Sequence, residues 1–298
     1  MSSAPIVGLG EVLWDLLPSG KVLGGAPCNF AFHCKQLGHP AEVVSRVGED
    51  ALGREIRQQL QALGLSDAFV QSDAIEKTGT VSVEFDASGH HTFTIHPGAW
   101  DQLAWTTALE ELAQRACAVC FGSLIQRSAT ARQTVQRFLQ AAQQARVIFD
   151  INLRQHYYNR EIIEASLQAC NWFKLNDEEL LLLQPMLTLK GTTQSDCLAE
   201  LRDRYALELV ALTRGEKGCL VQTATEEVEV PGVKVQVVDT IGAGDAFTAG
   251  LLVYSLEGKS VQQAATFATR YAGRVAAAAG GTPVIARQAV EADDKEVS

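Results

Sequence analysis

Hydrophobic positions along this chain fall into short continuous runs that are separated by longer amphipathic stretches. From residue 105 onward the two kinds of segment alternate regularly. The pattern predicts helices near 107–114, 129–144 and 160–168, and strands near 117–121, 146–150 and 171–175. Strands that alternate with helices form a mostly parallel sheet covered by helices on both faces. The sequence therefore predicts an α/β fold with three layers, α/β/α.

The same kinds of segment continue toward both ends of the chain. Expected strands lie at 5–9, 41–47, 207–213 and 218–222, and expected helices at 27–37, 242–256 and 261–279, with another helix ending near 63. The last dozen residues are mostly polar and predict a frayed tail. Neither a repeat nor a low-complexity linker interrupts the chain, so we expect residues 1–298 to form one domain.

The stretch from residue 78 to 97 has a different period. Apolar and polar side chains alternate in Thr80–Phe85 and in His91–Ile95, with a Ser-Gly turn between them, which is typical of a β-hairpin. Together with residues 11–23, this hairpin would form a small β lid on the large domain. One face of the hairpin is apolar, so a homodimer formed through the lid is a reasonable hypothesis.

Composition and charge exclude several classes of protein. The chain has 298 residues, 47% of them hydrophobic, and a net charge of -10, which rules out disorder and argues against nucleic acid as a partner. No apolar run approaches the roughly 18 residues of a membrane span, and the N-terminus lacks a secretory signal pattern. The seven cysteines are irregularly spaced, as in proteins with reduced thiols. We expect a cytoplasmic protein.

Two short motifs resemble known sites but lack their context. Cys117 and Cys120 form a C-x-x-C pair in an apolar strand, with no second pair at zinc spacing, so core packing is the simpler interpretation. Gly8-Leu-Gly10 lacks the third glycine of a dinucleotide fingerprint. We therefore expect neither a thiolate metal site nor a Rossmann dinucleotide site.

Small residues precede an apolar helix in the segment 238–250. Gly242, Ala243 and Gly244 lack bulk, so their backbone N–H groups can turn toward one point at the start of the helix, where the helix dipole favours an anion. Asp245 follows in the first helical turn. It could satisfy N–H groups of that turn, or it could accept the proton of an alcohol during phosphoryl transfer. The segment alone does not decide between these roles.

A second glycine-rich segment spans residues 24–38. Two glycines before a helix allow the backbone to approach a ligand closely, and Asn29 falls in the first turn, where its amide could bind hydroxyl groups. A tight turn followed by a helix with a local Asn cap is the alternative.

These two segments, in this order and about 215 residues apart, resemble the two signature motifs of the ribokinase-like (PfkB) sugar kinases. The resemblance extends from Gly8 to about Pro283 and implies a ribokinase-like fold. Further segments that match the family are Gly10–Asp15, Val47–Gly53, Asp150–Arg154, Asn176–Glu179 and Thr213–Gly218.

The resemblance implies a role for each matching residue. Asp245 would be the general base, and Gly242, Ala243 and Gly244 would form the anion site over the γ-phosphate. The other sugar hydroxyls would be bound by Asp15, Gly25, Asn29, Arg154 and Asp101. For Arg154, solvation at a strand end is an equal alternative, and His96 fits a structural histidine better than a sugar ligand.

Nucleotide and metal sites follow from the same resemblance. Asn176, Thr213, Arg214 and Gly215 would bind the nucleotide, and Glu179 would bind Mg²⁺ through water. Asn176 and Glu179 also fit a capping box, and both roles can hold together. Asp239 and Ile241 resemble residues that supply oxygen ligands to a monovalent cation such as K⁺ in part of the family. The adenine pocket is expected near residues 268–281.

The resulting hypothesis is an ATP-dependent, Mg²⁺-requiring sugar kinase that phosphorylates a primary hydroxyl. The segments 10–15, 24–29 and 149–154 look most like bacterial fructokinases, which makes fructose the first candidate. Alternatives are a 2-keto-3-deoxygluconate kinase, a ribokinase or a nucleoside kinase, and, outside the kinases, a sugar- or nucleotide-binding protein. An NAD-dependent oxidoreductase is disfavoured by the missing third glycine.

Overall fold

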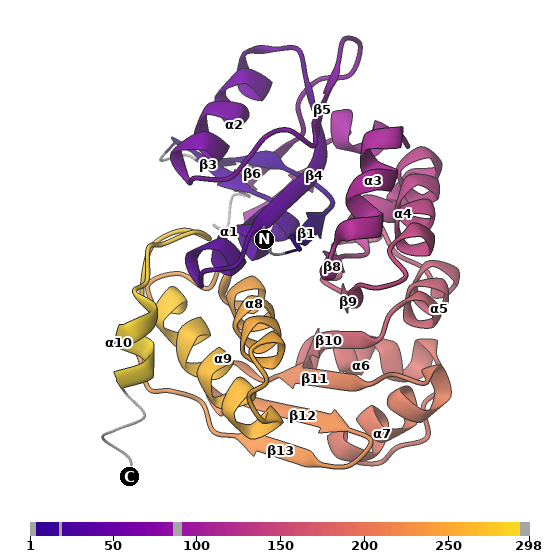
Figure 1. The fold of residues 1–298 in the computed structure, drawn as a ribbon, viewed down its shortest axis with the longest axis vertical. Coiled ribbons are helices and arrows are strands. Elements are labelled where there is room, and N and C mark those ends of the chain that lie inside the picture. Colours follow the sequence, from indigo (N-terminus) through magenta and orange to yellow (C-terminus); the bar gives the residue numbers. More distant parts are fainter. Residues whose placement is uncertain (1–3, 18–19, 86–90, 293–298) are drawn as a thin grey trace.

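A computed structural model describes residues 4–17, 20–85 and 91–292 of the chain. Nine of the strands in these ranges form one large sheet (Figure 1). In chain order they are β1 (Ile6–Leu9), β4 (Ala41–Gly48), β5 (Val70–Asp73), β8 (Ala118–Phe121), β9 (Arg146–Asp150), β10 (Trp172–Asn176), β11 (Leu209–Thr213), β12 (Cys219–Thr223) and β13 (Glu227–Val230). Their order across the sheet is β13-β12-β11-β10-β9-β8-β1-β4-β5. All neighbours from β11 to β5 are parallel, and β12 and β13 add an antiparallel edge.

Helices cover both faces of this sheet, as the alternation of segments predicts (Figure 1). One face carries α1 (Ala26–Gln36), α2 (Ala51–Ala62), α8 (Ala243–Leu256), α9 (Val261–Ala276) and α10 (Arg287–Ala292). The opposite face carries α3 (Thr107–Arg115), α4 (Ala129–Ala141), α5 (Arg160–Ala169), α6 (Asp177–Met186) and α7 (Gln194–Tyr205). Short 3-10 helices lie at Ala99–Gln102, Leu124–Arg127 and Gly215–Lys217.

Alternate residues of each strand enter two separate hydrophobic cores. Ile148 of β9 packs with α1, α8 and α9, whereas its neighbours Val147 and Phe149 pack with α3 to α7. This division follows from the two-residue period of a strand. On the second face Phe149 stacks between Phe121 and Phe173 of the adjacent strands, with ring centroids 5.1 and 5.6 Å away. The three-layer α/β/α prediction is confirmed.

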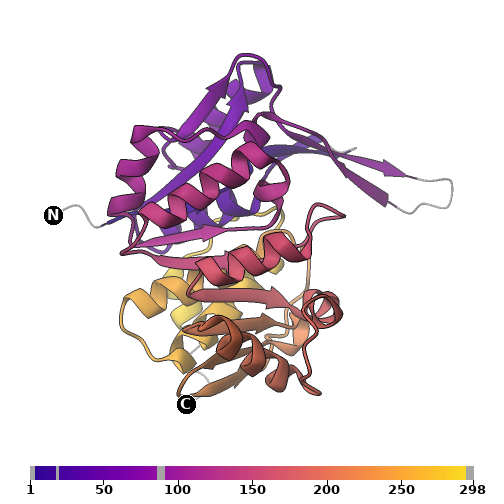
Figure 2. The same cartoon turned by 90° about the vertical axis from the view of Figure 1, so that its right-hand side faces the viewer.

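A second sheet forms the lid that the hairpin pattern predicts. Its strands are ordered β3-β2-β6-β7 and comprise β2 (Leu13–Leu17), β3 (Gly20–Gly24), β6 (Thr80–Phe85) and β7 (His91–Ile95). Figure 2 shows the β6–β7 hairpin extending away from the main body. The Ser-Gly turn expected between these two strands falls in residues 86–90, outside the described ranges.

The sequence pattern missed some elements and extended others too far. Strands β5 and β13 and helix α7 were not expected, and the supposed polar tail contains α10. Helix α9 ends at Ala276, where a helix to residue 279 was predicted. The loop that follows contains Gly280 with a φ of +77°, a left-handed conformation that favours glycine.

Candidate active site

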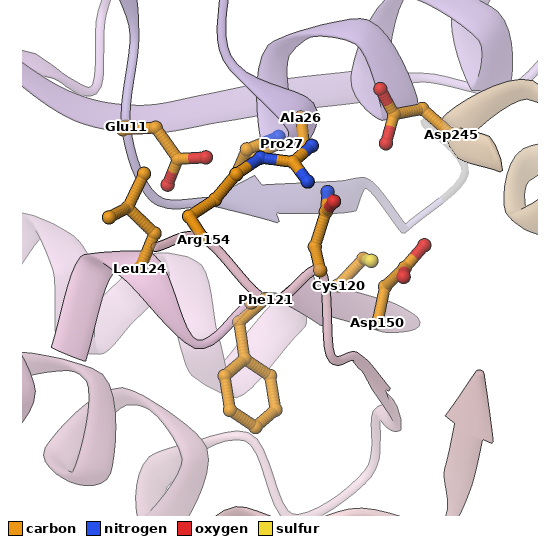
Figure 3. A pocket seen from close by; sticks show the side chains of 11 residues that line it. Glu11, Ala26, Pro27, Cys120, Phe121, Leu124, Asp150, Arg154 and Asp245 are labelled. Carbon is orange, nitrogen blue, oxygen red and sulfur yellow. The ribbon is translucent and has the colours of Figure 1, made fainter. Parts of the chain in front are cut away.

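The pocket drawn in Figure 3 lies at the carboxyl ends of three strands of the large sheet, β1, β8 and β9. Open parallel sheets bind ligands at this edge because the loops after several strands converge there. The loops after β1, β8 and β9 and the first turns of α1 and α8 supply its lining. The lining residues are Glu11, Ala26, Pro27, Cys120, Phe121, Gly122, Leu124, Asp150, Asn152, Arg154 and Asp245.

Asp245 lies in the first turn of α8 with its side chain in this pocket (Figure 3). Its Oδ2 accepts a hydrogen bond of 2.9 Å from Asn29 Nδ2, in the first turn of α1. Both side chains are buried. The contact joins the two glycine-rich segments, 216 residues apart.

Gly242 is the N-cap of α8 and has a φ of +75°. A Cβ atom at this position would lie 2.4 Å from the carbonyl oxygen of Gly281, so a larger residue would displace the loop after α9. Gly242, Ala243 and Gly244 are only partly buried, beside the buried Asp245. The start of α8 therefore places the positive end of the helix dipole next to a carboxylate, and the Ala243 N–H group donates to the Thr240 carbonyl at 3.3 Å.

The surroundings of Asp245 shift its pKa in opposite directions. Burial, followed by the negative charge of Asp150, raises its pKa to about 6, while the Asn29 amide, Lys174 and Arg154 act to lower it. A carboxylate with this pKa is ionised at neutral pH and still accepts a proton readily, which suits a general base.

Lys174 is a buried cation that the sequence analysis did not identify. Its Nζ lies 3.1 Å from Asp150 Oδ1, and the other Asp150 oxygen accepts a 2.9 Å hydrogen bond from Thr248 in α8. Burial opposes the charge of Lys174, but Asp150, Glu179 and Asp245 together raise its pKa. A Cβ atom on Gly244 would lie 3.0 Å from Nζ, so the ammonium group lies directly behind the predicted anion site.

Two predicted sugar-binding residues lie beside this pocket. Arg154 lines it, and its positive charge acts on Asp15, Asp245 and Glu11. Burial raises the pKa of Asp15, on β2 of the lid, to about 6, and Arg154 partly offsets this effect. A third, Gly25, has a φ of +117°, and a Cβ there would lie 2.3 Å from the backbone oxygen of Glu11. The structure therefore brings Asp15, Gly25, Asn29, Arg154 and Asp245 to one region.

Asn176 and Glu179 form the expected capping box at the start of α6. Asn176 Oδ1 accepts from Glu179 N at 2.8 Å, and Glu179 Oε2 accepts from Asn176 N at 2.8 Å. Glu179 Oε1 also accepts from Leu153 N at 2.9 Å, which fixes the loop that carries Arg154. The capping interpretation is confirmed, and each carboxylate oxygen retains a lone pair for a water molecule.

Asp239 connects two loops near the start of α8. Its Oδ1 accepts from Ile241 N at 3.0 Å and its Oδ2 accepts from Gly280 N at 3.1 Å. The residues predicted to bind a monovalent cation are thus joined to the loop that follows α9.

Asp101 lies outside the pocket lining and has other partners. It forms a two-point ion pair with Arg127, with N···O distances of 2.7 and 2.8 Å, and it accepts from Gly98 N at 3.1 Å. The carboxylate that was expected to face the sugar therefore fixes the 3-10 helix after the lid. His96 likewise has a structural partner, Ser82 Oγ, 2.8 Å from its Nε2.

Two residues of the predicted nucleotide loop also have partners within the protein. Arg214 Nη2 lies 2.8 Å from Glu229 Oε1 on β13, and Thr213 Oγ1 contacts the Leu175 carbonyl at 3.4 Å. Gly215 begins a 3-10 helix with a φ of +55°. Arg214 would have to leave Glu229 to contact a nucleotide.

All seven cysteines are free thiols, including Cys117 and Cys120. Within residues 4–292, apart from the undescribed stretches, no helix has the length and apolar character needed to cross a membrane.

A layered α/β/α body, a β lid and a carboxylate beside an exposed helix start define the architecture of a sugar kinase, and comparison with known proteins agrees. Residues 19–286 match the model of the pfkB family carbohydrate kinases. The chain therefore belongs to this family and is a carbohydrate kinase.

Individual relatives include fructokinases. The chain is 31% identical over 258 residues to a fructokinase of Klebsiella pneumoniae, with 82% of each chain covered. It is 30% identical over 262 residues to an aminoimidazole riboside kinase of Salmonella typhimurium, covering 82% of this chain and 78% of the relative. The crystal structure of a Xylella fastidiosa fructokinase with bound ATP superimposes with a TM-score of 0.85 at 22% identity, covering 98% of this chain and 99% of that chain, which supports the fold.

Proposed function

We propose that this kinase transfers the γ-phosphoryl group of ATP to a primary hydroxyl of fructose. The observation that carries the proposal is the buried Asp245 at the start of α8, hydrogen-bonded to Asn29 and facing a pocket that Arg154 also lines. Fructokinases at 31% identity support the choice of sugar.

The reaction uses Asp245 as the general base. Its carboxylate accepts the proton of the sugar hydroxyl as that oxygen forms a bond to the γ-phosphorus, the bond from phosphorus to the bridging oxygen breaks, and ADP leaves. The backbone N–H groups of Gly242, Ala243 and Gly244 hold the negative charge of the transferring group. Lys174, behind Gly244, adds a fixed positive charge at this end of the pocket.

The acidic surroundings fit a requirement for Mg²⁺. Asp150, Glu179 and Asp245 surround one ammonium group, that of Lys174, so nucleotide phosphates need further cations to bind beside them. Among the described residues no three acidic, His or Cys side chains form a direct metal site, which favours contact from Glu179 through water. Mg²⁺ bound there would offset phosphate charge.

A monovalent cation near Asp239 and Ile241 belongs to the same proposal. The Asp239 carboxylate joins residues 239–241 to the loop after α9, and backbone oxygens of both segments are the type of ligand that K⁺ takes. A cation there would stabilise the loops that hold Gly242 in place.

The second candidate acceptor is a riboside. The relative named aminoimidazole riboside kinase, at 30% identity, favours this alternative over the other sugars considered from the sequence.

Nucleotide contacts from Asn176, Thr213, Arg214 and Gly215 and an adenine pocket near residues 268–281 remain part of the proposal.

An ADP-release assay tests the function directly. Purified protein is supplied with MgATP and, in turn, fructose, ribose, an aminoimidazole riboside, 2-keto-3-deoxygluconate and adenosine. We expect the highest kcat/KM with fructose. A higher value with another acceptor would contradict fructose as the substrate while leaving the kinase class intact.

Replacing the base tests its role. We expect Asp245→Asn to lower kcat by about 100- to 10,000-fold while the sugar still binds, as measured by calorimetry. Asp196→Asn is a matched control, because Asp196 has the same helical position in α7 but lies outside the pocket lining. Near-normal turnover of the Asp245 variant would show that another group is the base.

A further inference from the structure

Glu11 is a buried carboxyl group that the proposed mechanism does not use. It follows β1, is 7% exposed, and lines the pocket together with Arg154 (Figure 3). Its Oε2 is buried and has no hydrogen-bond partner within the protein. Buried polar atoms are nearly always paired, so an unpartnered carboxyl oxygen that faces a pocket indicates a ligand group that supplies the missing donor.

The backbone around Glu11 is held firmly against the start of α1. A Cβ atom on Gly10 would lie 2.6 Å from the ring of Pro27, and one on Gly25 would lie 2.3 Å from the Glu11 carbonyl oxygen. Hydrogen bonds from the backbone N–H groups of Glu11 and Ala26 also act on the carboxyl group. These contacts hold the carboxyl group in place, while Oε2 has no partner within the protein and the residue lines the pocket.

The charges that line the pocket limit what can bind beside Glu11. Three lining residues are acidic, namely Glu11, Asp150 and Asp245, and Arg154 is the one described lining residue with a cationic side chain. The nearby Lys174 is already paired with Asp150. A neutral polyol can donate hydroxyl hydrogen bonds to these carboxylates, whereas a carboxylate on the substrate would be repelled by them.

We propose that Glu11 is a specificity-determining residue of the acceptor pocket, an inference that rests on the proposed kinase function. Its Oε2 accepts a hydrogen bond from a hydroxyl of a neutral polyhydroxy substrate, and its negative charge discriminates against sugar acids. Arg154, held between Glu11 and Asp245, is then partly neutralised by the protein and is a poor partner for a substrate carboxylate.

The test compares kcat/KM for two acceptors in a single preparation of each protein. The acceptors are fructose, which is neutral, and 2-keto-3-deoxygluconate, which carries a carboxylate. The proteins are wild type, Glu11→Gln and Glu42→Gln, assayed at pH 8. Glu42 is a matched control because it is a partly buried carboxyl group with an unpartnered Oε2 that does not line the pocket. The ratio of the two kcat/KM values does not depend on the fraction of folded enzyme.

We expect wild type and Glu42→Gln to prefer fructose. Glu11→Gln should raise KM for fructose and lower the ratio of kcat/KM for fructose to kcat/KM for 2-keto-3-deoxygluconate at least about tenfold, because a hydrogen bond to a charged group is lost. An unchanged ratio in Glu11→Gln, or a wild-type preference for the sugar acid, would overturn this inference while leaving the kinase assignment intact. If no acceptor supports ADP release, the proposed function itself fails. A lower melting temperature with an unchanged ratio would mean that Glu11 only supports the start of α1.

Discussion

At the scale of single residues, the site depends on how Asp245 is ionised. Burial and Asp150 favour its neutral form, and Asn29, Lys174 and Arg154 favour the carboxylate. The pKa of about 6 results from this opposition. A general base works only when it is deprotonated, so turnover is expected at neutral pH and is lost in acid.

This balance predicts a pH profile. In wild type, kcat/KM should fall as the pH decreases through about 6, because protonated Asp245 cannot accept the hydroxyl proton. Asn29→Leu removes the hydrogen bond that lowers the pKa of Asp245, so the acid limb should move to higher pH. Initial rates measured between pH 5 and 9 give the pH profile of kcat/KM for wild type and for the variant. An acid limb that stays in place in the variant would show that Asn29 does not control the base.

Several site residues could be predicted from the sequence and others could not. Asp245, Asn29 and Gly242 lie in glycine-rich segments whose local chemistry indicates an anion site. Lys174 lies between the apolar residues Phe173 and Leu175 of β10, and its charge is stable there because the neighbouring strand places Asp150 3.1 Å away. No local pattern reveals such a pairing across strands.

At the scale of elements, His33 connects α1 to α9 and to the loop after it. Its Nε2 lies 3.0 Å from the Gly281 carbonyl and must donate to it, so Nδ1 of the neutral ring accepts from Tyr271 OH at 2.9 Å. Gln36 Nε2 in turn donates to Tyr271 OH at 2.7 Å. Burial lowers the pKa of His33 to about 4, so the ring is neutral in the folded protein.

The stability of this junction should depend on pH. The unfolded chain takes up a proton at His33 near pH 6.5, while the folded protein resists protonation to about pH 4, so stability is lost as the pH falls through this range. Because the unfolded chain takes up this proton, the free energy of unfolding should be about 2 kcal/mol lower at pH 5 than at pH 7. Urea denaturation at both pH values measures this change. The His33→Gln variant should show a smaller decrease in the free energy of unfolding between the two pH values. The His39→Gln variant should show the full decrease, because His39 lies nearer the surface.

Elements with a strong periodic pattern were predicted well, and those that depend on tertiary contacts were not. The lid hairpin and the alternating strands and helices were expected. Helix α10 was taken for a polar tail, because its stability comes from outside itself. Arg287, its first residue, makes a two-point ion pair with Glu257 after α8, with N···O distances of 2.6 Å, and Val290 is fully buried.

At the scale of the whole molecule, the lid exposes an edge strand and large apolar side chains. The β6–β7 hairpin extends from the body, and β7 is an edge strand of the lid sheet (Figure 2). Phe93 on β7 is 51% exposed and Leu16 on β2 is 37% exposed. Exposed edge strands and apolar patches of this kind are typical of interaction surfaces.

We therefore predict a homodimer in solution that forms through the lid. Light scattering coupled to size-exclusion chromatography should give twice the chain mass of 32.1 kDa. Phe93→Lys should shift the population toward monomer, because it places a charge in the contact. Leu181→Lys, at a 69% exposed apolar position on α6 of the main body, should leave the dimer intact. A monomeric wild type would contradict the prediction.

The contact between Asn29 and Asp245 also has a consequence for synthesis of the protein. The two residues are 216 positions apart, and the Gly281 backbone packs against both Asn29 and Gly242. A nascent chain on the ribosome can fold its first strands and helices early, but the pocket lacks its proposed base until residue 245 has emerged. The contacts of Asn29 and Gly242 with Gly281 form only after residue 281 has emerged. Translation products that end before residue 245 are therefore expected to transfer no phosphoryl group, because they lack the proposed base.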